Sequence, residues 1–247
     1  MIQKALNYLV GLGKDEVKIE TVTLPDGTQQ VYSNVPLKRL SKYIPTADSI
    51  KMSTLTSLVD YIKGNTDTMA ERMIVQVKSP VEVCLFSQLD EDRNREYLVN
   101  VTAQVPDFNY EKFIDHEKFC INVQSKFLND PETDKDLILK FAGTVEQGSV
   151  AEYGDNGVTQ KATVRTGIAS KADAVVPNPV KLRPYRTFME VEQPVSEFIF
   201  RMAEERGITC ALFEADGGAW KNAAMQNIKN YLEFELADYK DQFTVIS

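Results

Sequence analysis

Histidine and cysteine are scarce in this chain. Its 247 residues include one histidine, His116, and three cysteines, Cys84, Cys120 and Cys210. A single histidine excludes most Ser-His-Asp, Cys-His and multi-histidine metal sites. The cysteines are odd in number, far apart and flanked by apolar residues, which fits neither a disulfide framework nor zinc spacing. We therefore expect buried free thiols in a reducing compartment, and a solvated or helix-capping role for His116.

The chain also lacks a long apolar run and an excess of positive charge. No run approaches the ~18 residues of a membrane span, and the N-terminus lacks the apolar core of a signal peptide, so we expect a cytoplasmic protein without membrane contact. Lysine and arginine number 28 against 36 acidic residues, a net charge of -8. Proteins that grip duplex DNA are more often basic. This acidity favours solubility and basic partners.

Apolar periodicity predicts both strands and helices. A helix over 1–12 precedes a hairpin whose second strand is 29–33, and strands at 73–79, 81–87 and 97–103 form a meander. Further helices are expected after Ser53 as N-cap, with Gly64 as the stop, after Asp115 as N-cap, over 132–146 and after 216–218. Strands follow at 158–168 and 210–213, and an edge strand at 243–246.

These elements predict one α+β domain spanning residues 1–247. We expect a curved, mostly antiparallel sheet with helices packed on one face, and 43% hydrophobic residues supply its core. A weak subdivision is expected near 147–157, where the composition changes to glycine, threonine, valine and alanine. Exposed strands predict self-association into a homo-oligomer.

The densest stretch is 183–202, which reads as two β-like segments separated by Pro194. In the second segment Phe198, Phe200 and Met202 alternate with Ile199 and Arg201. Such alternation places the first three side chains on one side of a strand, facing a core.

A cationic and aromatic cluster opens this stretch, in a region with no acidic residue from 174 to 189. It consists of Lys181, Arg183, Tyr185, Arg186 and Phe188. Arginines beside aromatic rings can stack bases and hold phosphates, the chemistry of a nucleotide or single-stranded nucleic acid site. The competing interpretation puts the aromatic rings in the core and pairs the arginines with Glu190, Glu192 or Glu197 across a sheet.

A weaker anion-binding candidate lies at 214–220, where a strand leads into a helix. Backbone N–H groups around Gly217, Gly218 and Trp220 could bind an anion there, although Asp216 would repel a phosphate unless it turned away to cap the helix. Glu190, Glu192 and Glu197 could form a carboxylate metal or acid-base site, but a solvated strand face explains them as well. We assign no catalytic residue, no metal ligand and no cofactor.

Several of these segments together resemble a known family. They are Leu-Pro-Asp-Gly at 24–27, Leu-Thr-Ser-Leu-Val-Asp-Tyr-Ile at 55–62, Pro-Tyr-Arg-Thr-Phe at 184–188 with Glu-Val-Glu-Gln-Pro at 190–194, Phe-Ile-Phe-Arg at 198–201, and Ala-Leu-Phe-Glu-Ala-Asp-Gly-Gly-Ala-Trp at 211–220. The chain is similar over nearly its whole length to the YfdQ-like family of bacteriophage and prophage proteins. This resemblance implies a phage origin among early, non-virion genes, and it implies no catalytic residues because the family's function is unknown.

The sequence therefore predicts a non-enzymatic phage protein acting inside the host. It would bind a host protein or a nucleotide-type ligand and modulate host defence or phage replication. The first alternative is a single-stranded nucleic-acid binding or annealing accessory of recombination that uses the cluster at 181–188. The second is a carboxylate-metal enzyme built on the three glutamates.

Overall fold

The chain forms two compact units, residues 1–45 and 46–247. The computed structural model describes residues 19–23, 29–33, 47–69, 72–90, 93–147, 149–155, 160–166, 170–176, 178–204 and 207–247. The helix predicted over 1–12 lies outside these residues, as does part of the subdivision predicted near 147–157. That the whole chain is one domain stays a prediction.

The first unit contains the predicted hairpin. Strands β1 (Ile19–Thr23) and β2 (Gln29–Ser33) pair antiparallel, with Ile19 opposite Ser33.

In the second unit a five-stranded sheet confirms the predicted meander. Its order is β14-β4-β5-β6-β3. The central strands β4 (Met73–Ser79), β5 (Glu82–Ser87) and β6 (Tyr97–Thr102) are antiparallel, whereas β14 (Phe243–Ile246) and β3 (Ile50–Met52) pair in parallel at the two edges. Pro80 lies in the turn between β4 and β5, where its missing N–H costs no ladder bond.

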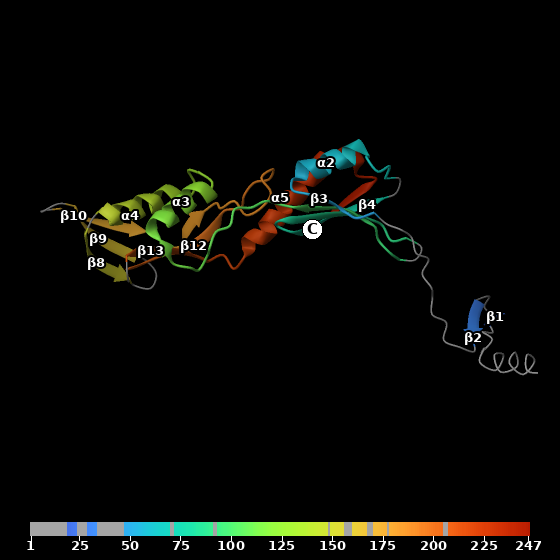
Figure 1. Ribbon diagram of the computed structural model, residues 1–247, viewed down its shortest axis with the longest axis horizontal. Coiled ribbons are helices and arrows are strands. Elements are labelled where there is room, and N and C mark those ends of the chain that lie inside the picture. Colours follow the sequence, from blue (N-terminus) through green and yellow to red (C-terminus); the bar gives the residue numbers. More distant parts are fainter. Residues whose placement is uncertain are drawn as a thin grey trace, which may run out of the picture. The chain divides into compact units, whose positions relative to one another are not determined.

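Helices α2 (Leu55–Gly64) and α5 (Ala219–Glu235) pack on this sheet (Figure 1). They share one core with it, which includes Leu58, Ile62, Val75, Val99 and Leu232. A short 3-10 helix, η1 (Ala237–Tyr239), connects α5 to β14. The apolar stripe of α2 is buried as its spacing predicts.

Both ends of α2 differ by one residue from the prediction. Thr54, not Ser53, is the N-cap, because its backbone is extended and its side chain accepts a hydrogen bond from the Ser57 N–H. Gly64 is the last helical residue, and Asn65 ends the helix in the left-handed conformation with φ 43°, which asparagine tolerates better than most residues.

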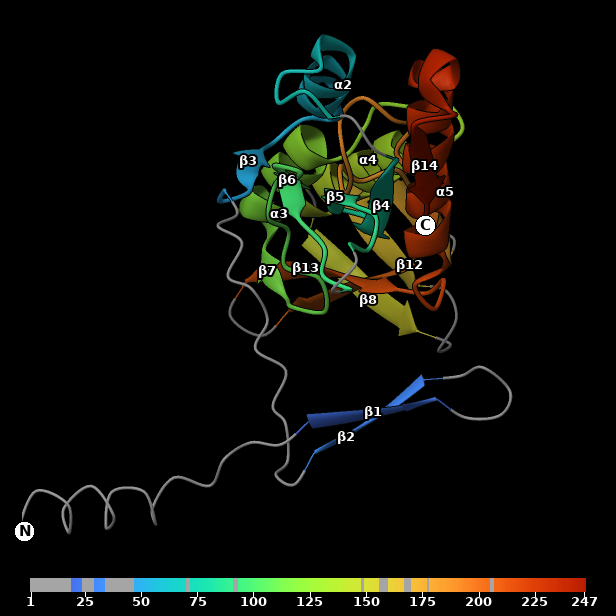
Figure 2. The same ribbon diagram turned by 90° about the vertical axis from the view of Figure 1, so that its right-hand side faces the viewer.

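A second, four-stranded sheet is antiparallel throughout. Its order is β11-β12-β13-β7, formed by β11 (Val180–Leu182), β12 (Ser196–Glu204), β13 (Ile208–Glu214) and β7 (Ile114–Asp115). Helices α3 (His116–Lys126) and α4 (Lys135–Gln147) lie over one face of β12 and β13 (Figure 1, Figure 2). Between them lies a second core with Phe119, Phe127, Ile138, Phe198 and Phe200.

Two sequence predictions are confirmed in this sheet. Phe198 and Phe200 are fully buried and Met202 nearly so, whereas the intervening Ile199 and Arg201 stay partly exposed. Asp115 caps α3, since its Oδ1 accepts hydrogen bonds from the backbone N–H groups of Glu117 and Lys118.

A three-stranded antiparallel sheet completes the described strands. It consists of β8 (Ser149–Asp155), β9 (Gln160–Thr166) and β10 (Ser170–Val176) in the order β10-β9-β8, and α4 contacts it. The α+β class is therefore confirmed. In place of one curved sheet, the described strands fall into separate sheets, because residues 183–195 form a loop and not a strand that could join them.

Candidate functional site

The loop 183–195 corrects the prediction of two β-like segments, since only the second segment is a strand. The side chain of Gln193, 5% exposed, holds the loop together. Its Oε1 accepts hydrogen bonds from the backbone N–H groups of Arg186 (2.9 Å) and Thr187 (3.2 Å), and its Nε2 donates to the carbonyl of Phe188 (2.8 Å). One buried amide thus satisfies backbone groups that a strand partner would otherwise bind.

The structure separates the members of the predicted cationic and aromatic cluster. Lys181 is exposed on β11, and Phe188, 1% exposed, belongs to the core of the five-stranded sheet. Arg186 is buried at 7% exposure, whereas Tyr185 is partly exposed. The cluster is therefore not one continuous surface, although Tyr185 and Arg186 line the same pocket.

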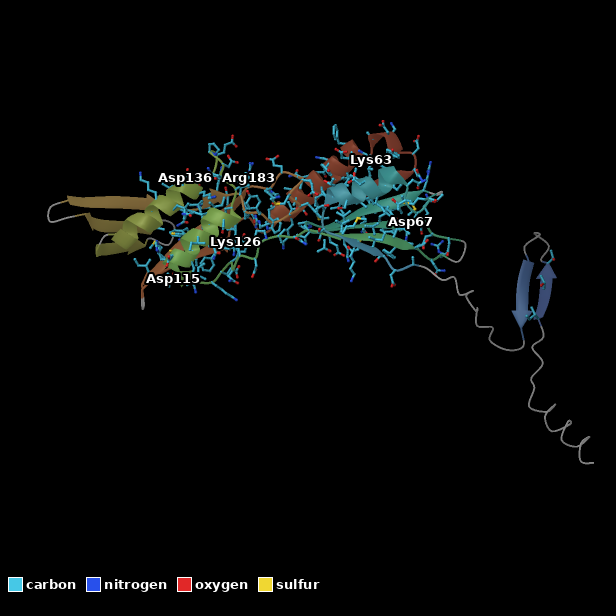
Figure 3. All side chains as sticks on the ribbon, turned by 45° about the horizontal axis from the view of Figure 1, so that its top comes forward. Lys63, Asp67, Asp115, Lys126, Asp136 and Arg183 are labelled. Atoms are coloured by element: carbon cyan, nitrogen blue, oxygen red, sulfur yellow. The ribbon has the colours of Figure 1, made fainter. Side chains whose placement is uncertain are left out.

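Arg183 lies at the C-terminal end of α3, where Lys126 is the last helical residue (Figure 3). Its guanidinium pairs with Asp130 (3.0 Å) and Glu192 (3.4 Å). The carbonyl of Arg183 accepts from the Leu128 N–H, and the Tyr185 N–H donates to the carbonyl of Lys126. This arginine is part of the structural connection between the loop and α3.

Of the predicted glutamate partners, only Glu192 pairs with an arginine among the described residues. Glu190 instead accepts a hydrogen bond from the backbone N–H of Thr56 (3.2 Å) at the start of α2, where a carboxylate is stabilised by the helix dipole. Glu190 and Glu192 lie in the loop, so they do not share a strand face with Glu197. Within the described ranges, no three acidic, histidine or cysteine side chains gather as a metal-binding group.

Arg186 is the centre of the remaining site. Its Nη1 donates to Glu214 Oε1 at 2.5 Å, and its Nη2 donates to the hydroxyl of Ser196. The guanidinium carbon lies 3.9 Å from the ring centre of Trp220, a close cation–π contact. Burial lowers the pKa of Arg186, and the nearby Tyr110 and Glu214 oppose that shift. Two donors here, Arg186 Nε and Trp220 Nε1, are buried and have no hydrogen-bond partner among the residues that the structure describes.

A pocket of about 450 Å³ lies beside Arg186. Four aromatic side chains line it: Phe108, Tyr110, Tyr185 and Trp220. Lys126, Lys221 and Arg186 supply positive charge, and Asp107, Glu111 and Glu214 supply an equal number of carboxylates. The pocket therefore combines aromatic side chains with equal numbers of positive and negative side chains, so its charge alone does not favour anions.

Trp220 belongs to this pocket and not to the anion site predicted at the strand-to-helix junction. Gly218 is the N-cap of α5, with φ 82°, and its N–H donates to Asp216 Oδ1 at 2.9 Å. The Ala219 N–H donates to the Asp216 carbonyl. Asp216 therefore accepts the Gly218 N–H, one of the donors predicted for the anion, although no side-chain hydrogen bond caps α5 at Gly218.

Sequence reasoning missed Gln193, Glu214 and the aromatic residues Phe108 and Tyr110. The last two follow Pro106 in a segment between β6 and β7, and this pairing of aromatic residues in a loop was the only signal available. The Tyr110 ring stacks on Phe198 with 5.6 Å between ring centres. Burial raises the pKa of Tyr110 to about 12.

His116 and the cysteines lie away from this pocket's lining. His116 is buried, and Asp115 occupies the N-cap, so the predicted solvated or capping role is wrong. Its Nε2 lies 3.6 Å from Cys120 Sγ, one helical turn away. None of the three cysteines forms a disulfide; Cys84 and Cys210 are buried as predicted, whereas Cys120 is partly exposed. Burial raises the pKa of Cys210 to about 12.

No family model, curated protein or solved structure matches this chain. Among the described helices, none combines the length and the apolar character needed to cross a membrane.

Proposed function

We propose that this chain is a non-enzymatic binding protein and that the pocket beside Arg186 holds a nucleotide-type ligand. The observation that carries the proposal is the set of four aromatic side chains in one pocket with lysines Lys126 and Lys221. Aromatic faces stack nucleobases, and lysine ammonium groups bind phosphates. A volume of about 450 Å³ falls within the ordinary range for small-molecule sites.

Both lysines have hydrogen-bond donors that a phosphate could accept. Lys126 Nζ donates one hydrogen bond, to the carbonyl of Asp107 at 2.5 Å, and an ammonium group carries three donors. Lys221 is exposed, with its Nζ 5.9 Å from the centre of the Trp220 ring. A phosphate at the pocket mouth would lie between these two cations while the base stacks inside.

Balanced charge in the pocket makes the base as important as the phosphate. Asp107 and Glu111 offset the lysines, so a bare phosphate gains little net attraction. A long single strand of nucleic acid would also meet the overall charge of -8. These electrostatics favour a mononucleotide over single-stranded nucleic acid, the alternative function.

The resemblance to phage proteins supplies the setting of this proposal. We place the protein in the cytoplasm of an infected host, where binding of a nucleotide-type ligand would connect it to host defence or to phage replication. In this proposal the protein binds the ligand without changing it chemically.

Trp220 is the only tryptophan, so its fluorescence reports on this pocket directly. We expect adenosine monophosphate to quench it saturably, adenosine to bind more weakly, and ribose 5-phosphate to give no saturable change. Calorimetry with the same three compounds is an independent readout. Tighter binding of oligothymidylate than of any mononucleotide would support the single-strand alternative instead.

Lys126→Ala should weaken binding of adenosine monophosphate about tenfold, or 1.4 kcal/mol, because it removes one phosphate contact. Lys118→Ala is the matched control, since Lys118 is exposed on the same helix and does not line the pocket. The proposal fails if the monophosphates of adenosine, guanosine, cytidine and uridine all leave Trp220 fluorescence and the calorimetric signal unchanged.

A further inference from the structure

Arg186 has hydrogen-bond donors to spare in the pocket that it lines. A guanidinium carries five N–H donors, and within the described residues Arg186 uses one on Glu214 and one on Ser196. Its Nε–H is buried and has no partner there. A buried donor without an acceptor is unfavourable, so an acceptor atom on a ligand would stabilise the complex.

The three carboxylates that line the pocket differ in what lies next to them. Glu214 pairs with Arg186. In the part of the chain that the structure describes, neither Asp107 nor Glu111 has a side-chain hydrogen bond or an ion pair. Lys126 donates to the backbone carbonyl of Asp107, so Asp107 lies beside the lysine that we assign to the phosphate. Glu111 is therefore the carboxylate that remains for the base.

The backbone places Glu111 next to the strand that carries Glu214. Glu111 has φ 62°, which is uncommon for a residue other than glycine, and its N–H donates to the carbonyl of Leu212 on β13 at 2.8 Å. Leu212 precedes Glu214 by two residues. Tyr110, just before Glu111, has its ring centre 5.9 Å from the guanidinium carbon of Arg186. The Glu111 carboxylate and the spare donors of Arg186 therefore belong to neighbouring parts of one pocket.

This combination of an arginine and a carboxylate matches guanine among the common bases. Guanine presents two adjacent acceptors, O6 and N7, which an arginine binds with two hydrogen bonds. It also presents two adjacent donors, N1–H and the 2-amino group, which a carboxylate accepts. Adenine has an amino group in place of O6, so it turns a donor towards the donors of the arginine. Cytosine and uracil lack the pair of adjacent donors.

We propose that the pocket selects guanine nucleotides, with Arg186 donating to O6 and N7 of the base and Glu111 accepting from N1–H and the 2-amino group. This inference rests on the proposed function, a nucleotide-type ligand in the same pocket, and specifies its base. Stacking on the aromatic side chains and the phosphate contacts of Lys126 and Lys221 are common to all nucleotides. Adenosine monophosphate therefore still binds, through these shared contacts alone.

A series of nucleoside monophosphates tests this selectivity on the full-length chain, by calorimetry and by Trp220 fluorescence. We expect guanosine monophosphate to bind about tenfold more tightly than adenosine monophosphate. Inosine monophosphate lacks the 2-amino group, and 7-deazaguanosine monophosphate lacks the N7 acceptor. Each should bind about fivefold more weakly than guanosine monophosphate, because each loses one hydrogen bond while the protein is unchanged.

Glu111→Gln tests the carboxylate. Glutamine has a similar size, but its amide replaces one acceptor oxygen with a donor that would face the donors of guanine. We expect the preference for guanosine over adenosine monophosphate to fall about tenfold. Glu117→Gln is the matched control, since Glu117 is exposed on α3 and does not line the pocket, and it should leave the preference unchanged. Circular dichroism verifies that both variants are folded.

The outcomes separate the choice of base from the proposed function. Equal affinities for guanosine and adenosine monophosphates would overturn the guanine assignment while nucleotide binding itself stands. A preference for guanine that Glu111→Gln leaves unchanged would also overturn it. If no nucleoside monophosphate binds at all, the proposed function fails, and the guanine assignment fails with it.

Discussion

Among the polar residues of the loop 183–195, which positions the pocket, Gln193 should contribute most to the free energy of unfolding. Gln193→Leu keeps a side chain of similar size but removes the bonds to the N–H groups of Arg186 and Thr187 and to the carbonyl of Phe188. A net hydrogen bond contributes about 1 kcal/mol, so losing these three lowers the free energy of unfolding by about 3 kcal/mol. The side chain is 5% exposed, so water cannot readily replace it.

Urea unfolding, followed by Trp220 fluorescence and by circular dichroism, measures this loss. Gln226→Leu is the control: Gln226 is exposed on α5 and bonds only to Asn230 one turn on, at 2.7 Å, so its removal should cost no more than about 0.5 kcal/mol. Equal losses in the two variants would show that the amide of Gln193 does not hold the loop.

A second variant separates the two halves of this amide. Gln193→Glu keeps an oxygen acceptor for the two N–H groups but replaces the donor to Phe188 with a second carboxylate oxygen. That oxygen faces a carbonyl, which is repulsive until the carboxyl is protonated. We expect the variant to be destabilised at neutral pH and to regain stability as the pH falls. Full stability at neutral pH would mean that the donor half is dispensable.

The other predictions concern pH dependence and helix capping. Burial raises the pKa of Tyr110 from 10.0 to about 12, so its contribution to stability is complete below pH 10.0 and is lost as the pH rises towards 12. The free energy of unfolding of Tyr110→Phe should therefore depend less steeply on pH in this window. An unchanged pH dependence would contradict the assignment. Thr54→Ala removes the N-cap bond to the Ser57 N–H and should cost about 1 kcal/mol in urea unfolding, whereas Ser53→Ala, one residue earlier, should cost almost nothing.

The sequence pattern correctly predicted features that depend only on residues close together in the chain. The alternation at Phe198, Phe200 and Met202 predicted a buried strand face, because a strand's side chains point to opposite sides whatever its neighbours are. The cap at Asp115 was equally predictable, since its carboxylate bonds to N–H groups two and three residues away. Such interactions join residues that are only two or three positions apart in the sequence.

The candidate pocket could be predicted only in part. Tyr185, Arg186 and Trp220 were all selected as functional candidates, but they were assigned to two different sites. The contact between Arg186 and Trp220 joins residues 34 positions apart, and Tyr110 lies farther still along the chain. Periodicity and capping patterns span only a few residues, so they cannot predict contacts between residues so far apart in the sequence.

The amino-acid sequence by itself determined the α+β class, the meander of β4 to β6, the N-cap of α3 and the core side of β12, because these depend on periodicity and on capping over a few residues. Tertiary structure alone decided that residues 183–195 fold as a loop around Gln193, that Arg183 and Arg186 pair with different carboxylates, and that Arg186 packs on Trp220. Those outcomes depend on which distant groups satisfy a buried charge or a buried backbone N–H, and that choice is made only when separate elements pack together.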